Sequence, residues 1–304
     1  MTEAFRSVAS MWIGSTLSYL ERVVIQSFLD RGHNFTLYTL HPVANVPDGV
    51  VLRDARTILV PPFEMDCDRV RFTAGIYSDL FRLEMIAMTD AIWVDLDAYC
   101  VAPFDFEGPY VFGSTRKRRA SPNNGVLGLP TDSAALSMLR IFLNDPNPIP
   151  WWWNARRTGA LLEKRAAGVR YGIENFAWSF SGPLALRKAL EKTGEITHIL
   201  SKDVLYPVGF NQSDLLLSPD TPVEMIETPR TRSVHLFGAT KLTLIGQHGG
   251  RPPAGCYIDR ICRRHGVDID RFPLDMSRGG RELVSDNAFD STLIASSAQV
   301  AGEP

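Results

Sequence analysis

Residues 78–97 read SDLFRLEMIAMTDAIWVDLD, and this stretch decides the fold that we expect. Apolar residues over 72–88 recur at helical spacing, which predicts a helix. The run 91–96 that follows is short and apolar, which favours a buried strand, and Asp95 and Asp97 lie at its carboxyl end. Ligands of open α/β sheets bind beyond the carboxyl ends of strands, so the acidic pair stands where a site is expected.

The segments before this stretch predict the start of a parallel sheet. Ser7–Ile13 and Phe35–Leu40 read as strands, and Leu17–Asp30 between them has helical spacing. A strand, a crossover helix and a second strand favour parallel pairing. Further strands are expected at 50–52, 57–60, 110–114, 125–129, 204–207 and 233–237, and further helices at 133–143, 158–167 and 184–192.

Composition narrows the class of protein. The 304 residues are 45% hydrophobic and 22% charged, as in ordinary globular proteins, and the net charge of -2 does not suggest a nucleic-acid partner. No stretch approaches the ~20 apolar residues of a transmembrane helix, so we expect a cytoplasmic protein. The four cysteines, at positions 67, 100, 256 and 262, lack the spacing of a disulfide scaffold or a zinc site and are expected to be reduced.

Asp95 and Asp97 are the first candidate site residues. Residues two apart in a strand point the same way, so two carboxylates converge at one strand end. Hard oxygen ligands of this kind suit Mg²⁺ or Mn²⁺ and can bridge the ion to phosphate oxygens. The alternative is a polar strand end without a ligand.

Asp79 and Arg82 are the second pair. They lie three apart on the expected helix and therefore share a face. An aspartate that accepts hydrogen bonds from sugar hydroxyls and an arginine that stabilises negative charge would suit a sugar-phosphate ligand. The alternative is a surface ion pair worth about 0.3 kcal/mol.

These motifs resemble those of a family of enzymes. The S-D-x-x-R of Ser78, Asp79 and Arg82, followed by an apolar strand that ends on D-x-D, is similar to the glycosyltransferases with a DxD sugar-binding region. That group includes the Och1-like mannosyltransferases, the α-1,4-glycosyltransferases and the glucosylating clostridial toxins. Met11-Trp12-Ile13-Gly14 resembles its first-strand W-x-G, Ser181-Gly182-Pro183 its downstream G-P turn, and Ser233-Val234-His235-Leu236 its late strand histidine. Where the group often has Gly-Gly before the D-x-D strand, this chain has Thr89-Asp90-Ala91.

The resemblance implies roles for individual residues. It implies a GT-A type, Rossmann-like fold with a mixed, mostly parallel sheet flanked by helices. Trp12 and Gly14 would bind the nucleotide-sugar donor, with Trp12 stacked on its base. Asp79 and Arg82 would hold the sugar and its phosphate linkage. Asp95 would contact ribose or sugar. Asp97 would bind Mn²⁺ or Mg²⁺, with His235 as a further metal contact or a satisfied buried histidine.

The resemblance also implies the reaction and its setting. It predicts a hexosyltransferase that retains configuration, with UDP favoured over GDP, working on a glycan or glycolipid acceptor in surface polysaccharide or lipopolysaccharide biosynthesis. We expect one catalytic domain over 1–275, with a donor half at about 1–130 and an acceptor half at about 131–275, and a loose tail at 276–304. A peripheral contact with the inner face of the membrane is a further expectation.

Three surface features have competing interpretations. Asn123 and Asn124 could contact the acceptor or form an ordinary turn. Trp152, within Trp151–Trp153, could offer an aromatic platform to an acceptor sugar, touch a membrane or pack in the core. The basic run Arg116–Arg119 could meet an anionic acceptor or a lipid headgroup, although a solvated loop is the commoner case.

Two other functions fit parts of the sequence. A phosphatase of the haloacid dehalogenase type also has an apolar strand ending in D-x-D, and Asp95 would be its nucleophile. In that class the motif usually lies near the N-terminus and needs a later acidic pair, which this chain lacks. A non-catalytic nucleotide-sugar-binding module is the second alternative.

Overall fold

A mixed sheet stands at the centre of the molecule. The computed structural model describes residues 5–62, 70–118, 120–177 and 179–276. Five strands pair in the order β3-β2-β1-β4-β6. The strands are β1 Val8–Trp12, β2 Phe35–Thr39, β3 Val51–Asp54, β4 Ile92–Val94 and β6 Val126–Leu127. β3, β2, β1 and β4 run parallel and β6 is antiparallel, which confirms the expected mixed, mostly parallel sheet flanked by helices.

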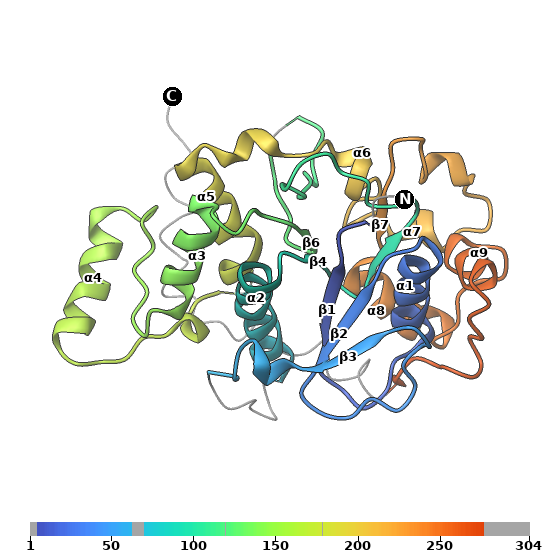
Figure 1. Ribbon diagram of the computed structural model, residues 1–304, viewed down its shortest axis with the longest axis horizontal. Helices are drawn as coiled ribbons and strands as arrows, with labels where there is room; N and C mark the ends of the chain where they lie inside the picture. The colour runs from blue at the N-terminus through green and yellow to red at the C-terminus, as the bar shows by residue number, and fades with distance from the viewer. Residues whose placement is uncertain (1–4, 63–69, 119, 178, 277–304) are drawn as a thin grey trace.

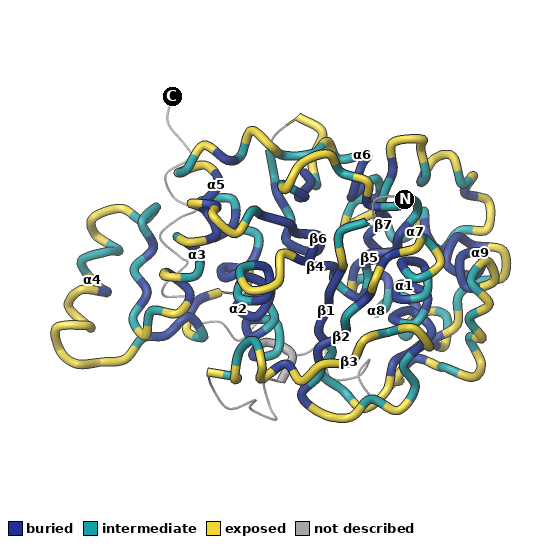
Figure 2. The backbone as a smooth tube through the Cα atoms, in the orientation of Figure 1, coloured by how far each residue is buried: buried dark blue, intermediate teal, exposed yellow. Residues whose placement is uncertain are grey.

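Alternate residues of each strand feed two hydrophobic cores, one on each face of the sheet. Val8 and Ile92 point into the first core, while Ala9 and Trp93 point into the second. Both sets are fully buried, as expected for parallel strands covered on two faces. In Figure 2 the central strands are accordingly dark blue along most of their length.

Helices cover both faces (Figure 1). The first core is closed by α1 Tyr19–Asp30, α8 Phe237–His248 and α9 Tyr257–Arg264, with the short helices α6 Lys202–Leu205 and α7 Ser213–Leu217 nearby. The second is closed by α2 Val70–Thr89, α3 Ala134–Asn144 and α5 Ala185–Thr193. Helix α4, Ala155–Ala166, buries only Leu161 and projects at one end of the molecule.

A second, two-stranded sheet joins distant parts of the chain. β5, Ala98–Cys100, follows directly after Asp97 and pairs antiparallel with β7, Ser233–His235. The register sets Ala98 opposite His235. The late strand therefore lies beside the corner between β4 and β5, where the acidic pair is located.

The structure corrects three predicted strands. Residues 57–60 are not a strand, because the Asp54 side chain accepts from the Arg56 N–H and starts a short helical turn at Ala55–Thr57. Residues 204–207 overlap helix α6, where the Tyr206 N–H donates to the Lys202 carbonyl at 2.9 Å in the helical pattern. Over 110–114 the pairing is confined to isolated bridges.

The turn before β4 contains Asp90 where the DxD glycosyltransferases often have Gly-Gly. Asp90 adopts a left-handed backbone conformation, with φ of 54°, which is costly for a residue with a side chain. Arg6 donates to both the carbonyl and the carboxylate of Asp90, at 2.9 and 3.0 Å from Nη2, and so stabilises the turn.

Some expectations concern other parts of the chain. The tail expected at 276–304 lies, apart from Met276, outside the described residues, as do Cys67 and Arg119. Cys100, Cys256 and Cys262 are free, buried thiols. Across the described ranges, every helix is too short or too polar to cross a bilayer.

A buried carboxylate at the start of α3 gives a stability prediction. Glu195 accepts hydrogen bonds from the Ser133 hydroxyl at 2.5 Å and the Ala135 N–H at 2.8 Å. Burial opposes ionisation, but these hydrogen bonds prevail and lower the pKa of Glu195. Glu195→Gln should reduce the free energy of unfolding by about 1–3 kcal/mol at neutral pH, measured by urea titration.

The sign of the pH dependence follows from the lowered pKa. The stabilisation is fully present above the unfolded-state pKa of about 4.3 and is lost as the pH falls through the folded-state value. The difference between wild type and Glu195→Gln should therefore shrink in acid. A difference that stays constant through that range would contradict this account.

Candidate functional site

A cleft of about 660 Å³ opens at the carboxyl ends of β1 and β4. The chain runs outward from β1 through β2 to β3 and then returns to place β4 on the other side of β1. This reversal is a topological switch point, where the connections leave a crevice for a ligand. Trp12, the last residue of β1, and Asp95, the first after β4, both line the cleft.

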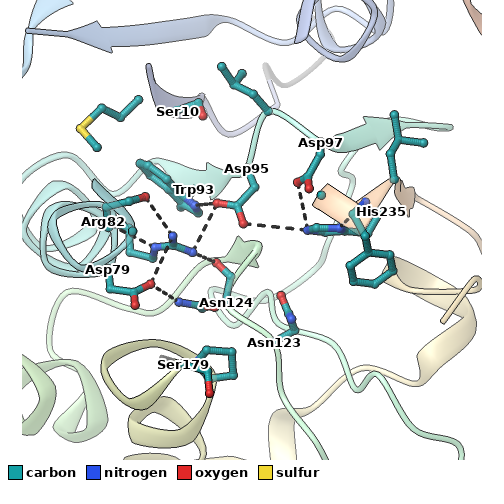
Figure 3. Close-up of a pocket in the computed structure, with 18 of the residues that line it drawn as sticks. Ser10, Asp79, Arg82, Trp93, Asp95, Asp97, Asn123, Asn124, Ser179 and His235 are labelled. Carbon is teal, nitrogen blue, oxygen red and sulfur yellow. Dashed lines mark hydrogen bonds and ion pairs between the residues drawn. The ribbon is translucent and has the colours of Figure 1, made fainter. Parts of the chain in front are cut away.

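Asp95, Asp97 and His235 converge in this cleft (Figure 3). The Nε2 atom of His235 lies 3.2 Å from Oδ1 of Asp97 and 3.9 Å from Oδ2 of Asp95. Each residue offers one ligand atom within 4.8 Å of the other two. Two carboxylates and an imidazole are a suitable donor set for a divalent ion, so the cluster could hold a metal.

Two of these atoms make no hydrogen bond despite being buried. Asp97 Oδ1 and His235 Nε2 face each other, but within the described chain neither forms a hydrogen bond. Buried polar atoms without partners are rare in folded proteins and call for an explanation. A metal ion between them would satisfy both.

The protonation of His235 is set by its neighbours. Burial disfavours the charged ring, but the carboxylates of Asp97 and Asp95 prevail and raise the pKa of His235. The Phe237 N–H donates to Nδ1 at 3.3 Å, which leaves the proton of a neutral ring on Nε2. Ligation through Nε2 would move that proton to Nδ1 and break this long contact.

The two aspartates differ in charge stabilisation. Burial raises the pKa of Asp97 to about 6, and the charge of Asp95 acts in the same direction against that of His235. Burial acts on Asp95 too, but the Arg82 guanidinium, followed by His235, holds the pKa of Asp95 below its usual value. Trp93 Nε1 also donates to Asp95 at 2.7 Å, so Asp95 is fixed by its surroundings and Asp97 is the freer carboxylate.

Arg82 connects the Asp95 end of the site to Asp79 and Asn124. Its Nη1 donates to the Asn124 carbonyl at 2.5 Å and lies 3.4 Å from Asp95. Its Nη2 donates to the Ser78 hydroxyl at 3.0 Å and lies 3.3 Å from Asp79. Most donors of the guanidinium are therefore engaged by groups of the protein, and the guanidinium orients Asp79 and Asp95.

Asp79 accepts hydrogen bonds from two distant segments. Asn124 Nδ2 donates to Oδ1 at 2.8 Å and the Ser181 hydroxyl donates to Oδ2 at 2.7 Å. Burial raises the pKa of Asp79, although the positive charge of Arg82 acts to lower it. Gly182 allows this approach, since a Cβ there would lie 2.9 Å from Oδ2.

The remaining predicted residues are placed as follows. Trp12 folds back to donate to the Thr16 carbonyl at 3.0 Å, over Gly14, where a Cβ would lie 2.9 Å from the indole nitrogen. Asn123 and Asn124 line the cleft, and Asn123 Oδ1 accepts from the Gly125 N–H. Trp152 packs against Phe142 and Phe180 and is not among the lining residues.

Lys241 is absent from the residues predicted from sequence. It lines the cleft one turn into α8, beside the Trp12 ring, and its Nζ donates to Glu21 at 2.9 Å. Glu21 also accepts from the Ser18 N–H at 2.8 Å and caps α1. The sequence signal for Lys241 is its position six residues after His235, just past the predicted strand at 233–237.

Comparisons with known proteins give weak structural likenesses. No protein-family model and no curated protein matches the sequence. The solved structure titled PaToxG glycosyltransferase superposes with a TM-score of 0.38 and 12% identity, over 64% of this chain and 73% of that one. The WbbM bifunctional glycosyltransferase gives 0.24 and 13%, over 54% of this chain and 33% of its own length. Both scores are low, so a functional assignment rests on the residues of the cleft.

Gly125 provides a test of the metal cluster. A Cβ at this position would lie 2.5 Å from His235 Nε2, so Gly125→Ala must push the ring away from Asp97. We expect Mn²⁺ affinity, measured by isothermal titration calorimetry, to fall about 10- to 100-fold.

The matched control is Gly159→Ala on the exposed helix α4, where a Cβ meets nothing. It should leave Mn²⁺ affinity unchanged. Equal affinities in the two variants would show that His235 does not take part in the metal site.

Proposed function

We propose that the protein is a metal-dependent glycosyltransferase, which moves a hexose from a nucleoside-diphosphate sugar to a glycan acceptor. One observation carries the proposal: a possible three-residue metal cluster, a lysine in the first turns of a helix and a half-buried indole share one cleft at the sheet's switch point. The cluster would hold the metal, the lysine would bind the diphosphate, and the indole would stack on the base. The S-D-x-x-R and D-x-D motifs that resemble the DxD glycosyltransferases supply residues of the same cleft.

In this proposal the donor lies along the cleft from Trp12 to Asp79. Trp12 stacks on the base, with UDP favoured by the resemblance. Asp97, Asp95 and His235 hold Mn²⁺ or Mg²⁺, which when bound acts as a Lewis acid and neutralises charge on the leaving diphosphate. Lys241, near the positive N-terminal end of α8, stabilises the same charge. Asp79 accepts hydrogen bonds from the sugar hydroxyls, and Arg82 positions Asp79 and Asp95.

The chemistry we propose proceeds with retention and without a covalent intermediate. A covalent route needs a free carboxylate beside the sugar. Of the four carboxylates in the described lining, Asp95 and Asp97 would be occupied by the metal. Glu21 is hydrogen-bonded to Lys241 and Ser18, and Asp79 is hydrogen-bonded to Ser181 and Asn124. The bond from C1 to the diphosphate therefore breaks as the acceptor oxygen bonds to the same face, and the acceptor proton passes to the leaving phosphate oxygen.

The acceptor would enter opposite Trp12, past Asn123. We propose a glycan or glycolipid of a surface polysaccharide or lipopolysaccharide, made in the cytoplasm with the enzyme peripheral to the inner membrane face. The proposed domain division places most donor residues in about 1–130 and acceptor residues in about 131–275. His235 and Lys241 reach the donor site from the second half.

A donor panel tests the proposal. Purified protein is incubated with nucleotide sugars, with Mn²⁺, Mg²⁺ or EDTA, and free nucleotide is measured. We expect slow release from one donor that EDTA abolishes and that Asp97→Asn reduces by about 100-fold or more, because the variant loses a charged metal ligand.

Asp214→Asn, an exposed aspartate on α7, is the control and should behave as wild type. No release from any donor with either metal would refute the proposal. Release of phosphate from phosphomonoesters, abolished by Asp95→Asn, would instead identify the phosphatase alternative.

Trp12 gives a separate prediction for base stacking. Stacking of a base on an aromatic ring contributes about 1–3 kcal/mol, which corresponds to about 5- to 150-fold in affinity. Trp12→Ala should raise the KM for the donor by such a factor, whereas Trp12→Phe should retain most of the affinity. Mn²⁺ binding should be the same in both. An unchanged KM in Trp12→Ala would rule out the stacking role.

A further inference from the structure

Basic side chains gather beside the mouth of the cleft. We call this cluster the basic rim, and it comprises Arg116, Lys117, Arg118, Lys202 and Arg230. Backbone pairing brings its parts together, because the Ser114 N–H donates to the Leu200 carbonyl at 3.0 Å. The loop that follows Ser114 therefore lies next to the start of α6. Arg230 joins the cluster through a hydrogen bond of 2.9 Å to the Ser201 hydroxyl.

The loop that carries three of these charges is held in shape. The Ser114 hydroxyl accepts from the backbone N–H groups of Arg116 and Ser121, both at 3.2 Å. The Thr115 N–H donates to the Ser121 carbonyl at 2.9 Å and closes the loop. Arg116, Lys117 and Arg118 are exposed at its tip.

The positive charge of the basic rim is poorly balanced. Within the described ranges Arg116, Lys117 and Arg118 form no ion pair, and Asp203, 3.5 Å from Arg230, is the acidic partner that the rim does have. Burial, followed by the charge of Lys117, lowers the pKa of Lys202. Like charges held this close repel each other, and a bound anion would relieve that repulsion.

The rim continues into the cleft. Thr115, next to Arg116, lines the cleft, and Lys202 donates at 2.5 Å to the Pro207 carbonyl, at the start of the loop that carries the exposed ring of Phe210. Neutral residues line much of the cleft, among them Thr115, Ser179 and Phe210. The charged residues of the described lining are Glu21, Asp79, Arg82, Asp95, Asp97 and Lys241, all of them near the proposed metal and donor site.

We propose that the acceptor is a glycan that bears phosphate groups, whose phosphate binds the basic rim while a neutral sugar enters the cleft. This inference rests on the proposed function and adds the chemical class of the acceptor. Arginine and lysine side chains on one loop offer several donors to phosphate oxygens, and arginine can bind them in bidentate fashion. Because the rim runs directly into the cleft, its occupant is the substrate itself rather than a flat bilayer.

The test compares binding to immobilised oligosaccharides that are neutral, carboxylate-bearing or phosphate-bearing. Wild type with Mn²⁺ should bind phosphate-bearing glycans about tenfold more tightly than neutral ones, as expected from one charge-assisted hydrogen bond, and added salt should weaken the preference. The triple variant Arg116→Ala, Lys117→Ala, Arg118→Ala should lose it. A triple variant with the same charge change on the α4 side, Arg156→Ala, Arg165→Ala, Arg170→Ala, should keep it.

Three results would overturn the inference. The first is equal binding of neutral and phosphate-bearing glycans, and the second is an equal preference in both triple variants. The third is binding to vesicles of phosphatidylcholine and phosphatidylglycerol that is as tight as binding to the phosphate-bearing glycan and is lost in the rim variant. This third result would assign the rim to a membrane surface. The proposed function fails separately, if wild type releases no nucleotide from any donor. Glycan binding is measured without turnover, so the two failures are distinguishable.

Discussion

The guanidinium of Arg82 is the buried charge on which the cleft depends. It lies on α2 and contacts the Asn124 carbonyl, the Asp79 carboxylate and the Asp95 carboxylate, with its plane near the Trp93 ring. A buried aspartate without a compensating charge takes up a proton or destabilises the fold. One cation thus allows a helix, a loop and a strand end to bring their polar groups to the same point. Without it, the switch point between β1 and β4 would be lined by carboxylates that repel one another.

The site carries more negative than positive charge. Asp79, Asp95 and Asp97 share the cleft with Arg82 and with His235, and burial raises the pKa of two of the three carboxylates. A buried arrangement of this kind is stable when a cation completes it, and the unbonded atoms of Asp97 and His235 lie where that cation would bind. Without that cation the buried carboxylates destabilise this region, which is common at functional sites.

Two distant segments complete the cleft, and backbone pairing positions both. β7 pairs with β5 and so sets His235 beside Asp97, although 138 positions separate them in sequence. The loop after Phe112 pairs with Leu200, which puts the basic rim at the cleft mouth. Phe237, the first residue of α8, has a left-handed φ of 58°, a strained conformation at the point where the chain enters the helix that bears Lys241.

Local patterns in the sequence were enough to predict the mostly parallel sheet, the helix that carries Asp79 and Arg82, and the strand that ends just before Asp95. These follow from local periodicity, since apolar spacing distinguishes helix from strand within a few residues. The sequence did not determine α6, because a short buried apolar run has no periodicity that separates the two. Long-range contacts, which the sequence does not reveal, place Trp152 half-buried against the second core, Lys241 in the cleft, and His235 beside Gly125 at the candidate metal cluster. Those contacts depend on strand pairing and packing between segments far apart in the chain, and no local pattern records them.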